Sequence, residues 1–103
     1  MEIKFFDNSL EKFIVSLEDS TIAKIMHTID LLEMFGHKLG LPHSKRISKN
    51  IFELRIYGTQ KVRVFYTIHK TQAILLYGFV KKTQKIPQKE IKIVEKKIKA
   101  INK

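Results

Sequence analysis

The chain has 103 residues, with 20 Lys+Arg against 10 Asp+Glu, no Cys and 44% hydrophobic residues. This length and apolar content predict one domain, residues 1–103, with a buried core, which excludes a two-domain enzyme and a disordered tail. The lack of cysteine excludes disulfides, thiolate nucleophiles and thiolate metal sites, and fits a reducing cytosol. No apolar run approaches the roughly 20 residues that span a bilayer, and the N-terminus lacks a signal-peptide pattern, so we expect a cytoplasmic protein without a membrane partner.

Charge is distributed unevenly along the chain. Residues 1–36 carry seven acidic residues and three lysines, whereas residues 37–103 carry 17 Lys+Arg and three acidic residues. Like charges on one surface repel each other and do not help folding, so this concentration favours a polyanion, an anionic membrane or an acidic protein as partner. The alternative is a solvated lysine-rich surface, because 17 of the 20 basic residues are Lys. We interpret the basic part as a nucleic-acid-binding surface.

The N-terminal part predicts a short strand and two helices. Residues 2–6 (EIKFF) have the composition of a strand, and capping-type residues follow them. Apolar residues then recur at helical spacing over residues 10–17 and again over residues 22–32. Gly36 lies where a left-handed C-terminal cap is expected. The two helices form a hairpin with more apolar surface than the pair can bury, so we expect the hairpin to pack on a sheet.

The rest of the chain predicts this sheet and one more helix. Residues 37–50 (HKLGLPHSKRISKN) lack a sustained period and are predicted to form a basic loop. Three strand-like segments with polar connections follow, at residues 51–57, 61–68 and 73–80, which is typical of an antiparallel meander. Pro87 can open a final helix, and its apolar stripe consists of Ile91, Val94, Ile98 and Ile101. We therefore predict an α+β fold in which the helical hairpin and the C-terminal helix pack on a small twisted, mainly antiparallel sheet.

The apolar pattern also predicts the register of the first strand pair. Phe52, Leu54 and Ile56 alternate along one strand, and Val62, Val64, Tyr66 and Ile68 alternate along the next. Both sets face one core if the strands are joined by a three-residue loop, residues 58–60, because a slip of one residue would turn a whole set to solvent. Arg55 then lies directly opposite Arg63 on the other face of the sheet, which we expect to be exposed to solvent.

Two arginines in this position suggest a bound anion. Like charges that face each other across a sheet are destabilising unless something lies between them. Lys81 and Lys82 leave the third strand close to the same face, which favours the anion site. The alternative is that Glu53, diagonal to Arg63, neutralises the two arginines as part of an ordinary surface network.

Several motifs follow one another in an order that is more specific than any one of them. Leu41-Pro42 is followed by Phe-Glu-Leu-Arg at residues 52–55, by an arginine two residues before an aromatic (Arg63 and Phe65), and by GFVKKTQKIP at residues 78–87. With these motifs, the chain from about residue 5 to 95 resembles the phage-derived branch of HigB-type toxins in the RelE/ParE superfamily of toxin–antitoxin systems. The resemblance implies a RelE-like fold.

The resemblance also implies a function. The protein would be the toxin of a type II toxin–antitoxin system: an endoribonuclease (mRNA interferase) that binds the ribosomal 30S A site and cuts translating mRNA. Its partner would be a helix-turn-helix antitoxin of the HigA type. Such enzymes use no metal and no small-molecule cofactor, because the RNA 2′-hydroxyl attacks the adjacent phosphate and leaves a 2′,3′-cyclic phosphate and a 5′-hydroxyl. This chemistry needs a proton acceptor, cations around the phosphorane and a proton donor for the leaving oxygen.

The motifs match candidate catalytic residues to these roles. Arg55 and Arg63 match the stabilisation of the phosphorane. Glu53 is a candidate base, or else it only orients the arginines, because a carboxylate beside two arginines has its ionised form stabilised. Lys81 or Lys82 would stabilise charge or protonate the leaving group. The C-terminal tyrosine or histidine that several RelE relatives use has no clear match here.

Other residues receive simpler interpretations. Residues expected to follow the RNA backbone are Lys45, Arg46, Lys49, Lys61 and Lys85. The four histidines, His27, His37, His43 and His69, have no common short spacing, so no metal site is expected, and we predict that His43 and His69 are solvated. Tyr66 belongs to the core by its register. Tyr57 and Tyr77 are candidates for base stacking or for the acid.

Two functions of other classes are compatible with the same fold. One is a ParE-like inhibitor of DNA gyrase without nuclease activity, and the other is a catalytically inactive nucleic-acid-binding remnant. The lack of a clear acid and base permits the ParE-like function, whereas the Arg55–Arg63 pair beside Lys81 and Lys82 argues against it. Incubation with translating ribosomes separates them, because only a nuclease cuts mRNA in the A site.

Overall fold

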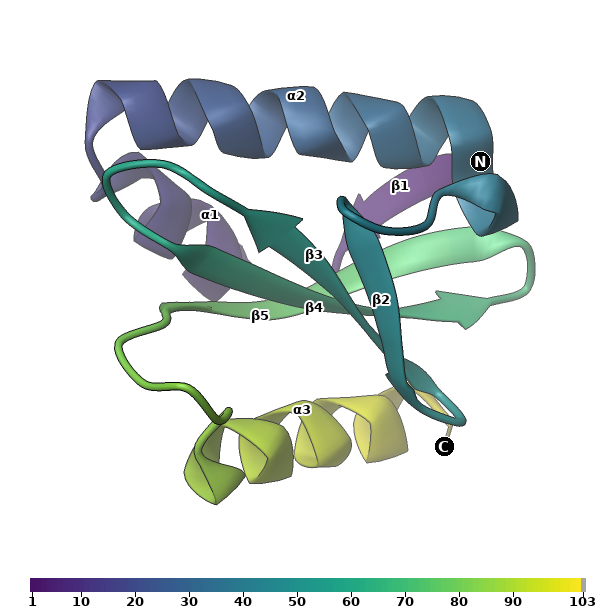
Figure 1. The fold of residues 1–103 in the computed structure, drawn as a ribbon. Coiled ribbons are helices and arrows are strands. Elements are labelled where there is room, and N and C mark those ends of the chain that lie inside the picture. Colours follow the sequence, from purple (N-terminus) through teal and green to yellow (C-terminus); the bar gives the residue numbers. More distant parts are fainter. Residues whose placement is uncertain (103) are drawn as a thin grey trace.

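A computed structural model describes residues 1–102 and shows a five-stranded sheet between two layers of helix (Figure 1). The elements are β1 (Glu2–Phe5), α1 (Asn8–Val15), α2 (Asp19–Phe35), a 3-10 helix (Gly36–Lys38), β2 (Ser44–Ser48), β3 (Ile51–Ile56), β4 (Val62–His69), β5 (Gln72–Val80) and α3 (Gln88–Ile101). Helices α1 and α2 cover one face of the sheet, and α3 covers the other. The predicted α+β architecture is confirmed. Within residues 1–102, no helix is both long and apolar enough to cross a membrane.

The strands lie in the order β1-β5-β4-β3-β2. Strands β2 to β5 pair in antiparallel fashion, whereas β1 is parallel to β5. The first strand of the chain therefore lies beside the last one, and the two long strands β4 and β5 occupy the interior of the sheet. Residues far apart in sequence are thus joined at the centre of the molecule.

Two apolar cores lie on the two faces of the sheet. The core under α1 and α2 contains the alternating residues predicted for it, with Leu54, Ile56, Val62, Val64 and Tyr66 all buried. The core under α3 contains Phe65, Leu76, Phe79, Val94 and Ile98. A bulge in the pairing of β4 with β5, between Phe65 and Tyr66, shifts the alternation in β5. Consequently two consecutive residues, Leu76 and Tyr77, both lie in the second core, whereas Leu75 is buried in the first.

The predicted hairpin register is confirmed, whereas the predicted basic loop is wrong. Arg55 pairs with Arg63, and Leu54 pairs with Val64. Part of the region 37–50, however, is the edge strand β2, in which Ser44 pairs with Leu54. An edge strand with mostly exposed residues has little apolar alternation, so the sequence pattern does not reveal it. Its buried anchor is polar, because the hydroxyl groups of Ser44 and Tyr66 form a hydrogen bond of 2.7 Å.

The expectation that Arg63 lies on a solvent-exposed face is also wrong. Arg63 is only 2% exposed, and Glu53 on the same face is only 3% exposed. Helix α3 packs on this face, and Phe79, the partner of Arg63 on β5, is buried there as well. Replacement of Arg63 by alanine would therefore leave a buried carboxylate without one of its cations and would affect folding as well as function.

The fold predicts that alanine destabilises the protein at Gly78 and is tolerated at Gly40. A Cβ atom at Gly78 would lie 2.9 Å from Phe13 Cε2 and 3.0 Å from Leu10 Cδ1, so β5 and α1 are packed too closely for a side chain. Gly78→Ala should lower the free energy of unfolding by about 1–3 kcal/mol, as overpacked cores do. Gly40→Ala is the matched control, because a Cβ atom there meets nothing within 4 Å. Urea unfolding measures both, and equal stabilities would contradict the packing of α1 on β5.

Candidate active site

A cationic groove of about 460 Å³ lies where the end of β3, the start of β4 and the segment after β5 meet. Its lining residues are Arg55, Tyr57, Lys61, Arg63, Lys81, Lys82, Thr83 and Gln84. The antiparallel register brings these parts together, since Val62 pairs with Ile56 on one side and with Val80 on the other. The backbone N–H of Lys81 also donates to the Lys61 carbonyl at 2.7 Å. This hydrogen bond holds the segment after β5 against the start of β4. The structure therefore brings both predicted arginines and both predicted lysines into one groove.

A buried carboxylate lies between the two arginines. Glu53 Oε1 is 3.4 Å from Arg55 Nε, and Glu53 Oε2 is 3.9 Å from Arg63 Nε. Both distances are those of ion pairs, yet Glu53 Oε2 and the two arginine Nε atoms have no hydrogen-bond partner within residues 1–102. The carboxylate thus offsets the repulsion between the two guanidinium groups without using all of their hydrogen-bonding capacity.

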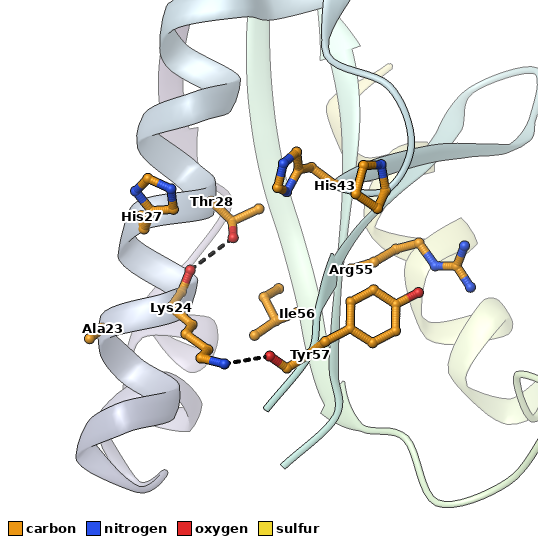
Figure 2. A pocket seen from close by; sticks show the side chains of 9 residues that line it. Ala23, Lys24, His27, Thr28, His43, Arg55, Ile56 and Tyr57 are labelled. Carbon is orange, nitrogen blue, oxygen red and sulfur yellow. Dashed lines mark hydrogen bonds between the residues drawn. The ribbon is translucent and has the colours of Figure 1, made fainter. Parts of the chain in front are cut away.

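The two arginines differ in how far a ligand can reach them. The Arg55 side chain is 22% exposed, whereas that of Arg63 is 3% exposed. Tyr57 follows β3 directly, and its ring centre lies 5.8 Å from Arg55 Cζ and 5.1 Å from Arg63 Cζ. Figure 2 shows Arg55 and Tyr57 side by side, both projecting away from α2. Arg55 is therefore the accessible cation, and Arg63 adds positive charge beneath Tyr57.

Lys81 is the lysine most affected by this environment. Burial lowers the pKa of its ammonium group, and the positive charges of Arg63, Arg55 and Lys61 lower it further, whereas Glu53 acts in the opposite direction. A lysine with a lowered pKa gives up its proton more readily than an ordinary one. Lys82 is exposed at the rim of the same groove.

The predicted RNA-contacting residues lie in several places. Lys61 lines the groove. Lys45 lies on β2, opposite Glu53 of β3 in the strand register. Arg46 donates hydrogen bonds to the carbonyls of Ser48 and Lys49, at 3.1 and 3.0 Å, so its guanidinium folds back over the turn between β2 and β3. Lys85 is exposed in the segment that precedes α3. Lys61 is thus the only one of these five that belongs to the groove lining.

The other tyrosines belong to the packing. Tyr66 is 3% exposed, and burial raises the pKa of its hydroxyl, so its prediction as a core residue is confirmed. The Tyr77 hydroxyl donates to Glu90 at 3.1 Å and ties β5 to α3. Burial raises the pKa of Tyr77, as does the negative charge of Glu90. Tyr57 is therefore the tyrosine that the structure places at the groove.

Thr83 and Gln84 are groove residues that no individual prediction named. Both lie inside the motif GFVKKTQKIP at residues 78–87, which is the sequence signal that points to them. Their polar side chains suit hydrogen bonds at the rim of an anion site. No three His, Asp or Glu side chains within residues 1–102 lie close enough to hold a metal ion.

A comparison with known protein families identifies the family of the chain. Residues 12–99 match the family described as phage derived protein Gp49-like. The chain belongs to this family. Gp49-like proteins are RelE/HigB-like toxins, so the resemblance to the toxin superfamily is confirmed at this level. The match extends from α1 into α3 and includes every residue that lines the cationic groove. A search of curated proteins returns no match.

The geometry predicts an unusual titration of Lys81. Its ammonium group should lose its proton below the ordinary lysine pKa, because burial and neighbouring cations disfavour the charged form. NMR titration of the lysine side-chain signals measures this pKa. In Arg55→Gln, which removes one of these cations, the pKa of Lys81 should move back upward. A Lys81 that titrates like a lysine in a short peptide would contradict the described environment.

Proposed function

We propose that this Gp49-like toxin is a metal-independent endoribonuclease that cuts translating mRNA in the ribosomal A site. The observation that carries the proposal is the convergence of five cationic side chains, those of Arg55, Lys61, Arg63, Lys81 and Lys82, on one groove around one buried carboxylate. A phosphodiester is the anion that such a groove suits, because its charge increases as the phosphorane forms.

Arg55 binds the non-bridging oxygens of the scissile phosphate in this proposal. Its side chain is 22% exposed, whereas its Nε is buried beside Glu53, so the outer end of the guanidinium meets the phosphate. Arg63 adds charge in a region from which α3 and Phe79 exclude water. The RNA 2′-oxygen attacks phosphorus, its proton passes to water, and the bond from phosphorus to the 5′-oxygen breaks. The products carry a 2′,3′-cyclic phosphate and a 5′-hydroxyl.

Glu53 is a positioning residue rather than the base in this mechanism. It is 3% exposed and lies at ion-pair distance from both arginines, so it is poorly placed to contact bound RNA. Lys81 is the proton donor for the leaving 5′-oxygen, because its lowered pKa makes the ammonium a better acid than an ordinary lysine. Lys82 contributes charge at the rim.

The distribution of charge supports docking on ribosomal RNA. The basic residues of β2 and the following turn, Lys45, Arg46 and Lys49, form part of the region 37–103, which carries 17 of the 20 Lys+Arg. These residues follow the phosphate backbone of RNA in this proposal, together with Lys61 and Lys85. Toxins of this family typically pair with helix-turn-helix antitoxins, and we propose such an antitoxin, of the HigA type, as the partner that holds this toxin inactive.

Single-turnover cleavage on translating ribosomes tests the proposal. The wild-type protein should cut mRNA in the A-site codon and leave a 2′,3′-cyclic phosphate, and a 2′-deoxy nucleotide at the attacking position should block the cut. Arg55→Ala should slow cleavage about 10²–10³-fold, the usual cost of one donor to the transition state. Lys12→Ala is the control, because Lys12 is exposed on α1 on the opposite face of the sheet.

Two results would overturn the proposed activity, and a third would overturn the proposed site. Intact mRNA together with inhibited supercoiling by DNA gyrase would establish the ParE-like function instead. Intact mRNA without any effect on gyrase would identify an inactive nucleic-acid-binding remnant. Arg55→Ala cleaving at the wild-type rate would show that the groove is not the catalytic site, even if the protein is a nuclease.

A further inference from the structure

A second groove lies on the other side of Arg55 and Tyr57. It has a volume of about 420 Å³ and separates α2 from the end of β3 (Figure 2). Its lining is predominantly apolar and includes the side chains of Ala23, Pro42 and Ile56. Its polar groups include the imidazole rings of His27 and His43, together with Lys24 and Thr28. His43 was predicted to be solvated in a loop, but it is partly buried and borders this groove.

Hydrogen bonds hold the walls of this groove in place. The Lys24 ammonium donates to the Tyr57 carbonyl at 2.8 Å and ties α2 to the end of β3. The backbone N–H of Arg55 donates to the His43 carbonyl at 2.8 Å and fixes the residues that precede β2. Lys24 also packs on Gly58, where a Cβ atom would lie 3.3 Å from Lys24 Cδ. The groove is thus preformed, and a ligand need not open it.

The lining chemistry selects the kind of ligand. Lys24 already uses its ammonium on a backbone carbonyl, and the Thr28 hydroxyl already donates to the Lys24 carbonyl at 2.8 Å, so the groove offers little to a phosphate. A neutral imidazole supplies one donor and one acceptor, which matches the polar edge of a nucleobase. Apolar and ring surfaces beside such groups are the usual environment of an unstacked RNA base.

The second groove adjoins the cationic groove, and this indicates which part of a ligand would reach it. Arg55 and Tyr57 line both grooves, and Tyr57 is 46% exposed between them. An RNA strand whose phosphate lies on the Arg55 guanidinium therefore passes the mouth of the second groove with its next base. We propose that the groove between α2 and β3 is a nucleobase subsite that holds a base of the RNA strand next to the scissile phosphate. This inference rests on the proposed ribonuclease function and assigns His43 as a determinant of base binding.

Binding of uncleavable RNA to the full chain tests the subsite. The probe is a short single-stranded RNA with a 2′-O-methyl group at the attacking position, compared with strands that lack one base at each neighbouring position in turn. His43→Ala should weaken binding of the intact strand at least about fivefold, the lower end of what one stacked base contributes. The same variant should bind the strand without the critical base as the wild type does. His37→Ala is the matched control, because His37 is exposed in the 3-10 helix.

A second measurement does not depend on the stability of a variant. In the wild-type protein, the His43 imidazole signals in NMR spectra should shift with the intact strand and should not shift with the strand that lacks the critical base. His43→Gln, which retains a donor and an acceptor, should bind the intact strand more tightly than His43→Ala does.

The outcomes separate this inference from the proposed function. Cleavage on ribosomes with equal affinity for intact and base-deleted strands, and with unchanged His43 signals, would overturn the subsite and leave the nuclease standing. Absence of both RNA binding and cleavage would overturn both. Shifts of His43 with an apolar peptide of an antitoxin but with no RNA would show that the groove is a protein-binding site instead.

Discussion

The buried carboxylate of Glu53 is the constraint on which the rest of the site depends. Two arginines face each other across β3 and β4, and one of them is almost completely buried. Burial of charges costs several kcal/mol per ion, and like charges in such a position repel each other. Glu53 lies at ion-pair distance from both arginines and offsets this repulsion. Its distances of 3.4 and 3.9 Å leave part of the hydrogen-bonding capacity of the three groups unused.

The surrounding fold sets the positions of the two arginines and shields one side of them from water. The register of β3 on β4 sets the two arginines opposite each other, and α3 covers the same face further along the strands. Phe79 pairs with Arg63 and stacks with Phe65, with ring centres 5.8 Å apart, so Arg63 lies beside an apolar core. An anion bound at the open end of the groove would meet positive charge that water screens only on one side. The charge of Arg63 therefore acts over a longer range than it would on a free surface.

Much of this arrangement follows from the sequence, and the remainder has physical reasons. The alternation of Phe52, Leu54 and Ile56 was enough to predict the register, because one face of the hairpin is buried. Strand β2 was missed because an exposed edge strand needs no apolar alternation. The burial of Arg63 was missed because the apolar stripe of α3 shows that the helix packs on something, but not on which face. The groove beside His43 forms only when the segment before β2 meets α2, a contact that no local pattern encodes.

The unfolding free energy of Glu53→Gln tests the central claim most directly. The substitution keeps the size of the side chain and removes the charge that offsets the two arginines. The account predicts a loss of about 3 kcal/mol in urea unfolding at neutral pH, as for other buried ion pairs deprived of one partner. Glu95→Gln, an exposed substitution on α3, should leave the stability unchanged. A Glu53→Gln protein as stable as the wild type would show that the arginines do not need the carboxylate, and it would contradict the account.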